Sequence, residues 1–127
     1  MIRTRQLAWA RWTPCQDRQR RPGAGATVIA IIIISFNTRE LLAQTLRSLY
    51  RALDGWQDTF RVIVVDNDSA DDSAAMVARD FPRAELLLPR DNLGFARGNN
   101  LAMRHLGFEQ GKMGSATFVW LLNSDTE

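Results

Sequence analysis

Three apolar stretches of the sequence each end in a short run that is rich in Asp, Asn, Ser and Thr. The apolar stretches are residues 28–34, 62–65 and 117–122, and the polar runs are residues 35–38, 66–69 and 123–126. Short apolar runs bounded by turn residues are typical of strands that are buried on both faces of a parallel sheet. Because such strands share one carboxyl edge, where ligands of open α/β folds bind, the sequence predicts an oxygen-rich ligand site there.

Two carboxylates at this predicted edge suit different tasks. Asp125 follows an apolar stretch, beside Asn123 and Ser124. A hard divalent cation such as Mg²⁺ binds carboxylate oxygen and takes its other ligands from substrate phosphates and water. Asp66 can accept a hydrogen bond from the imide N–H of a uracil or thymine ring, or from a ribose hydroxyl. A simple turn or cap role explains either aspartate equally well from spacing alone.

A third informative stretch is residues 92–100, which places Arg97 and Asn99 near a glycine-bearing helix start. Helix N-termini bind phosphate, and an arginine can pair with a diphosphate. An ordinary exposed arginine and surface asparagines are the alternative, and the residue types leave both open.

Several familiar kinds of site are missing from the sequence. It has no Gly-x-Gly-x-x-Gly dinucleotide motif, no Gly-Lys-Ser/Thr phosphate loop and no Gly-x-Ser-x-Gly nucleophile motif. Cys15 is the only cysteine and His105 the only histidine, which excludes an intrachain disulfide and a His/Cys metal cluster. The lone cysteine favours a reducing compartment, so we expect a cytoplasmic protein.

The elements that would position these residues alternate between strands and helices. We expect strands over residues 28–35, 60–66, 84–88 and 117–122, with helices after the first two and over residues 95–106. Two candidate capping boxes start the first two helices, Asn37 with Glu40 and Ser69 with Asp72. The predicted fold is therefore α/β: a Rossmann-like, mostly parallel sheet of about four strands with flanking helices.

The chain of 127 residues divides into a basic extension, residues 1–26, and a globular part, residues 27–127. The extension carries six arginines against one aspartate, and we expect it to be disordered. Alternatively, Trp9 and Trp12 form one face of a short helix on a membrane surface, which would place the protein at the inner face of the membrane, or translation starts downstream. The longest apolar run is far short of the roughly 20 residues that a spanning helix needs.

Four blocks together resemble the family 2 glycosyltransferases of GT-A fold, and most closely their rhamnosyltransferase-like branch. The blocks occur in the family's order, and they are Ile32–Thr38, Val64–Asp71, Asn92–Asn100 and Trp120–Thr126. The resemblance implies a nucleotide-diphosphate sugar as donor, either a dTDP- or a UDP-sugar. It also implies a divalent metal, Mg²⁺ or Mn²⁺, and sugar transfer with inversion at the anomeric carbon.

The resemblance also assigns candidate roles to single residues. Asp66 matches the acid that contacts the nucleotide base, and Phe36, Asn37 and Glu40 match the turn beside the base and ribose. Asp125 matches the metal-facing member of the Asp-x-Asp motif, although Asn123 replaces the first aspartate. The candidate donor-binding residues are Ser35, Phe36, Asn37, Glu40, Asp66, Asn67, Asn92, Gly94, Arg97, Asn99 and Asn123, and the candidate metal ligand is Asp125.

The resemblance covers residues 28–127, so we expect this chain to carry the donor and metal site only. The family's acceptor-binding half and general base lie further along, which places the base beyond Glu127. The implied acceptor is a saccharide or lipid-linked molecule of cell-surface polysaccharide synthesis, not a nucleic acid. The alternative is a non-catalytic nucleotide-binding or partner-binding module. A phosphoacceptor signalling domain is disfavoured, because it expects an acidic pair after the first strand.

Overall fold

The computed structural model describes residues 27–56, 59–109 and 114–124. The predicted extension, residues 1–26, and the predicted metal ligand Asp125 lie outside these ranges. The elements are, in chain order, β1 (Val28–Ser35), α1 (Arg39–Ala52), β2 (Thr59–Asp66), α2 (Ser73–Asp80), β3 (Glu85–Leu87), α3 (Gly94–His105) and β4 (Phe118–Asn123). The predicted order of strands and helices is confirmed.

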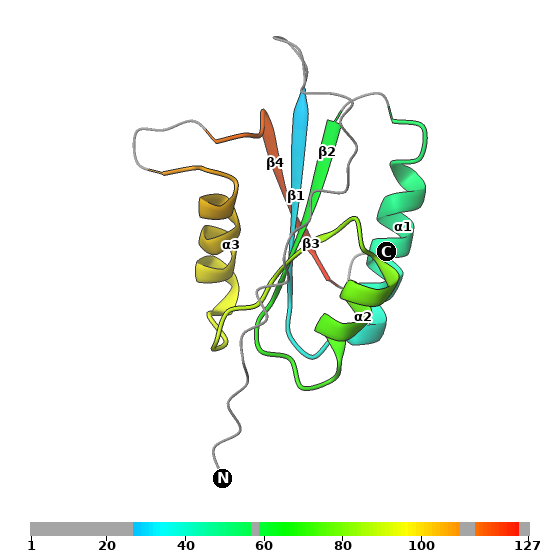
Figure 1. The fold of residues 1–127 in the computed structure, drawn as a ribbon, viewed down its shortest axis with the longest axis vertical. Coiled ribbons are helices and arrows are strands. Elements are labelled where there is room, and N and C mark those ends of the chain that lie inside the picture. Colours follow the sequence, from blue (N-terminus) through cyan, green and yellow to red (C-terminus); the bar gives the residue numbers. More distant parts are fainter. Residues whose placement is uncertain (1–26, 57–58, 110–113, 125–127) are drawn as a thin grey trace.

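The four strands form one sheet in the order β3-β2-β1-β4, and every neighbouring pair is parallel. Helices α1 and α2 cover one face of the sheet, and α3 covers the other (Figure 1). The two central strands are continuous β-branched runs because both of their faces are buried. Ile31–Ile33 and Val62–Val65 are each at most 1% exposed.

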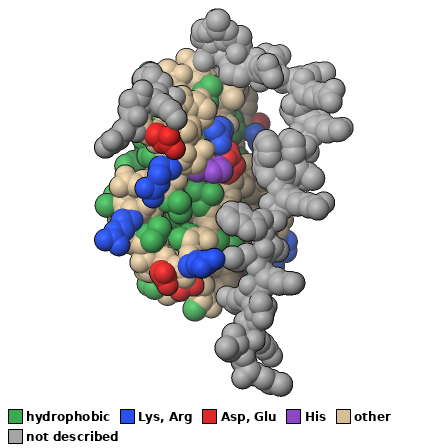
Figure 2. All heavy atoms as spheres, turned by 60° about the vertical axis from the view of Figure 1, so that its left-hand side comes forward, with side chains coloured by type: hydrophobic (Ala, Val, Ile, Leu, Met, Phe, Trp, Pro, Cys, Tyr) green, Lys and Arg blue, Asp and Glu red, His purple; other side chains and the backbone are tan. Residues whose placement is uncertain are grey.

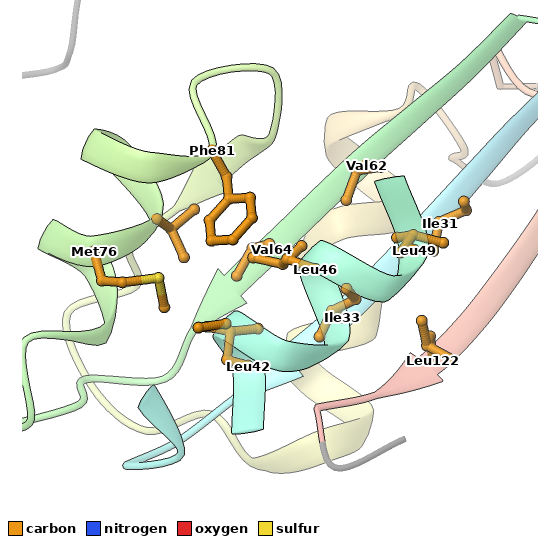
Figure 3. Close-up of a cluster of buried hydrophobic side chains, with 12 residues drawn as sticks. Ile31, Ile33, Leu42, Leu46, Leu49, Val62, Val64, Met76, Phe81 and Leu122 are labelled. Atoms are coloured by element: carbon orange, nitrogen blue, oxygen red, sulfur yellow. The ribbon is translucent and has the colours of Figure 1, made fainter. Parts of the chain in front are cut away.

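Alternate residues of the central strands belong to two separate hydrophobic clusters. Ile33 and Val64 pack with Leu42 and Leu46 of α1, on the face that α2 also covers (Figure 3). On the other face, Ile32, Ile63 and Val65 pack against Ala102 and Leu106 of α3. The residues that follow β1 and β2 are therefore held on a sheet that is anchored on both sides.

One edge strand, β4, departs from the sequence prediction. β4 was expected to be buried on both faces, but Phe118, Trp120 and Leu121 are 62%, 50% and 48% exposed. The prediction is wrong for this strand because β4 lies at the edge of the described sheet and pairs only with β1. Leu122 is buried against the α1 face and anchors the end of β4. In the described ranges, no helix is both long and apolar enough to cross a membrane.

Candidate functional site

The carboxyl ends of the strands meet at one rim of the sheet, as predicted. Ser35 pairs with Asp66 in the β1–β2 register, and Ile34 pairs with Asn123 in the β1–β4 register. The N–H of Asn67 donates to the carbonyl of Ser35 at 2.8 Å, which continues the β1–β2 pairing past the strand ends. Three of the residues that we predicted to bind the sugar donor, Ser35, Asp66 and Asn123, therefore lie side by side at this rim.

Asp66 is the last residue of β2 and is only 3% exposed. Burial raises the pKa of its carboxyl group, because a low-dielectric environment disfavours the charged form. Two hydrogen bonds from Ser69 act against this increase: its hydroxyl donates to Oδ1, and its N–H approaches Oδ2 at 3.4 Å. The nearby charges of Asp71 and Asp68 raise the pKa further. Asp66 thus has the position of a buried acceptor whose ionisation depends on its neighbours.

The loop after β1 is joined to the loop after β2 by hydrogen bonds. The N–H of Asn37 donates to Ser69 Oγ at 2.9 Å, and Asn37 Oδ1 accepts from the N–H of Ala70 at 2.8 Å. The N–H of Arg39 donates to Asp71 Oδ2 at 2.9 Å. Asn37 has a φ of 52°, a left-handed conformation that asparagine tolerates better than most residues. These hydrogen bonds therefore hold the two loops together beside Asp66.

These contacts replace both predicted capping boxes. Thr38 is the N-cap of α1 and Asp72 the N-cap of α2, and neither makes a capping hydrogen bond with its side chain. Asn37 Oδ1 accepts from Ala70 in the other loop. Ser69 Oγ accepts from the N–H of Asn37 and donates to Asp66, so neither side chain caps its own helix. Asp71 takes over at α2, where its Oδ1 accepts from the N–H and hydroxyl of Ser73.

Hydroxyl groups connect β1 to the end of β4. Ser35 Oγ lies 3.0 Å from Thr38 Oγ1, and Thr38 Oγ1 donates to Ser124 Oγ at 3.1 Å. Thr45 of α1 donates to the carbonyl oxygen of Ser124 at 2.9 Å. These bonds fix the residue that directly precedes Asp125. Ser35 is 1% exposed, so its side chain belongs to this connection, whereas Asn123 is exposed.

Asn67 attaches the start of α3 to the rim. It is 2% exposed, its Nδ2 donates to the carbonyl of Gly94 at 3.3 Å, and its Oδ1 accepts from the N–H of Leu93 at 3.4 Å. Asn92 Oδ1 accepts from the N–H of Gly94 at 2.8 Å, and Gly94 has a φ of 71°. A Cβ on Gly98 would lie 3.1 Å from a side-chain carbon of Ile34, so a larger residue there would require Ile34 to shift by a few tenths of an ångström.

The remaining residues that we predicted to bind the sugar donor differ in exposure and in hydrogen bonding. Asn99 is 7% exposed and donates to the carbonyl of Phe95, but its Oδ1 has no hydrogen-bond partner among the described residues. Arg97 on α3 is exposed, and so is Phe36, at 48%. Glu40 projects from α1 with an 81% exposed side chain, beside an open hollow that Thr38 and Asp71 also line.

The described ranges contain no group of three or more His, Cys, Asp or Glu side chains that could hold a metal ion. The sequence prediction missed Ser69, Asp71 and Thr38 as organisers of the rim. For Ser69 and Asp71 the sequence did contain a signal. Residues 66–73 include more Asp, Asn and Ser side chains than two helix caps would require. Asn, Asp, Ser and Thr side chains bind nearby backbone groups and so favour turns.

Comparison with known proteins identifies the family. The sequence matches glycosyl transferase family 2 over residues 30–127. The chain belongs to this family. Similar solved structures include the mannosyltransferase PcManGT from Pyrobaculum calidifontis in complex with GDP-Man and Mn²⁺, at 26% identity and a TM-score of 0.58. Another is S. aureus TarS 1-349 in complex with UDP-GlcNAc, at 24% identity and a TM-score of 0.57.

The alignments cover 76% of this chain and 27% of PcManGT, and 78% of this chain and 27% of TarS 1-349. The chain thus spans about a quarter of the length of these structures. The shared fold confirms the predicted GT-A arrangement of a Rossmann-like parallel sheet with flanking helices. Comparison with the curated proteins gave no significant match.

Proposed function

We propose that this chain binds the donor substrate of an inverting glycosyltransferase, a nucleotide-diphosphate sugar. The observation that carries the proposal is the buried carboxylate of Asp66 at the carboxyl rim, beside the end of β1. A carboxylate so deeply buried is costly unless polar partners meet it. Besides Ser69, the imide N–H of uracil or thymine is a suitable partner, so we propose a UDP- or dTDP-sugar. The nucleotide sugars in the similar structures, GDP-Man and UDP-GlcNAc, support the coarser class of a nucleotide-diphosphate sugar.

From α3, Arg97 would contact the diphosphate and Asn99 a hydroxyl group of the donor. The unpartnered Oδ1 of Asn99 is a buried acceptor that fits a hydroxyl group of the donor. Arg97 is exposed and can reach a phosphate. Phe36, Asn37 and Glu40 would border the base and ribose, because they follow β1 directly beside Asp66.

We propose Asp125 as the ligand of a divalent metal, with Asn123 beside it. The side chains at the rim offer oxygen atoms as metal ligands, which suits Mg²⁺ or Mn²⁺. Mn²⁺ is bound in the PcManGT structure. When bound, such a metal stabilises the negative charge of the leaving diphosphate. The hydroxyl contacts of Ser124 with Thr38 and Thr45 would position this segment against β1 and α1.

We further propose that the acceptor is a saccharide or lipid-linked molecule of cell-surface polysaccharide synthesis, with transfer in the cytoplasm at the inner face of the membrane. The branch of the family that the sequence resembles most is the rhamnosyltransferase-like one. A base must deprotonate the acceptor hydroxyl, and we assign that role to no residue of this chain. The alternative of a non-catalytic nucleotide-binding module makes the same donor contacts without transfer.

Calorimetric titration with UDP, dTDP and ADP tests the donor site. We expect Asp66→Ala to weaken UDP and dTDP binding by about 1.5–3 kcal/mol, the usual value of a hydrogen bond to a charged group. ADP binding should not change, because adenine has no imide N–H. An equal loss for all three nucleotides would show damage to the fold. Absence of UDP and dTDP binding by the unaltered chain would overturn the proposed function.

A further inference from the structure

The hydroxyl group of Ser69 contacts both sides of the rim. It donates to Asp66 Oδ1 and accepts the N–H of Asn37 at 2.9 Å. The N–H of Ser69 approaches the second carboxylate oxygen, Asp66 Oδ2, at 3.4 Å. One residue therefore bonds both oxygens of the acid that we place at the nucleotide base.

The loop after β1 holds Ser69 in this position. Asn37 donates its own N–H to Ser69 Oγ and accepts the N–H of Ala70 with Oδ1, at 2.8 Å. These two hydrogen bonds fix Ser69 and Ala70, two successive residues of the loop after β2. Because the serine oxygen already accepts a hydrogen bond from Asn37, its single proton is directed at Asp66.

The surroundings of Asp66 otherwise disfavour its charged form. The residue is 3% exposed, and the acidic groups that act on it are Asp68 and Asp71. Asp71 is itself bonded to the N–H of Arg39 and to Ser73, which keeps its own pKa low and its charge in place. The contacts that favour an ionised Asp66 both come from Ser69.

We propose that Ser69 is a positioning residue that keeps the Asp66 carboxylate ionised and oriented toward the nucleotide base. The proposal rests on the proposed function, and it adds a residue to which the sequence prediction gave only a helix-capping role. A protonated Asp66 keeps a carbonyl oxygen as acceptor but loses the negative charge that strengthens its hydrogen bond with the base imide. Binding would therefore weaken as the pH falls through the pKa of Asp66, and Ser69 would set the pH at which this happens.

The first measurement needs no nucleotide. The side-chain carboxyl carbon of Asp66 is titrated by NMR in the unaltered chain and in Ser69→Ala, Ser69→Thr and Ser48→Ala. Ser48 is an exposed serine on α1 and serves as the matched control. We expect a higher pKa of Asp66 in Ser69→Ala, and no change in Ser69→Thr or Ser48→Ala. An unchanged pKa in Ser69→Ala would overturn the proposal.

The second measurement is the pH profile of UDP binding by the same variants. We expect Ser69→Ala to bind about tenfold more weakly at the acid end of the profile, the size of a lost hydrogen bond to a charged group. The loss should shrink as the pH rises, and Ser69→Thr should restore binding. A uniform loss at every pH would indicate a merely structural serine and would contradict the proposal.

The two measurements separate this proposal from the proposed function. If UDP binding requires Asp66 but Ser69→Ala keeps the original pH profile, the role of Ser69 is refuted and the donor site stands. If the carboxyl titration shifts but the unaltered chain binds no UDP, the control of Asp66 by Ser69 stands and the donor site is refuted. Should Ser69→Ala fail to fold, Ser69→Cys keeps the side-chain size with a weaker donor, and it should raise the pKa of Asp66 in the same direction.

Discussion

Three asparagines near the rim retain different hydrogen-bonding groups for a ligand. Asn67 uses both polar atoms of its side-chain amide to bind the backbone of Leu93 and Gly94. The side-chain oxygen of Asn37, Oδ1, accepts from the N–H of Ala70. Asn99 alone of the three keeps a buried carbonyl oxygen without a partner in the described part of the chain. Of the three, Asn99 is therefore the best placed to contact the sugar donor directly, whereas Asn37 and Asn67 hold the loops that surround the site.

The metal assignment at Asp125 is testable with a single change of charge. Asp125→Asn keeps the size of the side chain and removes the negative charge that a hard cation requires. We expect Mn²⁺ to strengthen UDP binding by the unaltered chain relative to a chelator, and this gain to vanish in Asp125→Asn. Titration calorimetry measures both. Asp54→Asn, at an exposed position after α1, should keep the full gain. An undiminished gain in Asp125→Asn would show that the ion binds elsewhere.

At the scale of elements, strand identity was predictable from the sequence but strand environment was not. The runs 62–65 and 28–34 have the composition of buried strands, and β1 and β2 are central and buried. The run 117–122 has the same composition, yet β4 exposes Trp120 and Leu121 because its place at the sheet edge depends on pairing across the fold. The two capping boxes failed for a similar reason. The side chain of Asn37 binds Ala70, 33 residues away, and Ser69 Oγ accepts from the N–H of Asn37, 32 residues away, and no local pattern reveals these contacts.

A charged cluster ties β2, β3 and α3 together away from the rim. Arg61 forms two hydrogen bonds with Glu85, at 2.7 and 2.6 Å, and His105 Nε2 lies 2.7 Å from Glu85 Oε2. Figure 2 shows the histidine beside acidic and basic side chains on this side of the molecule. Burial opposes the ionisation of Glu85, but the bonds from Arg61 and His105 outweigh it and lower the pKa of Glu85.

Glu85→Gln should therefore destabilise the fold in a pH-dependent way. The Glu85 side chain is 22% exposed, so we expect a loss of about 2 kcal/mol near neutral pH, between the values of exposed and buried pairs. Because the pKa of Glu85 is lower in the folded state, its stabilising effect is present above the ordinary value of 4.5 and disappears as the pH falls through the lowered value. Urea unfolding at several pH values measures the difference. A difference that does not narrow in acid would contradict this explanation.

For the whole molecule, charge divides the chain at about residue 26. Residues 1–26 carry six arginines and one aspartate, whereas residues 27–127 carry ten basic and thirteen acidic residues. The two hydrophobic clusters are built from strands and helices that begin at Val28, and together they bury both faces of β1 and β2. Among the described residues, the core around the sheet is therefore built from elements within residues 28–123.

Deletion of residues 1–23 tests whether the fold depends on the basic extension. We expect the melting temperature to change by no more than about 2 °C, because the two hydrophobic clusters of the described residues are built from residues 28–122 and surface charge pairs contribute little. Differential scanning calorimetry of both forms at low and high salt measures this. Attraction between the basic extension and the acidic remainder would add a small stabilisation at low salt that high salt screens. A drop that is large and persists at high salt would instead require apolar packing of residues 1–23 against the sheet or its helices.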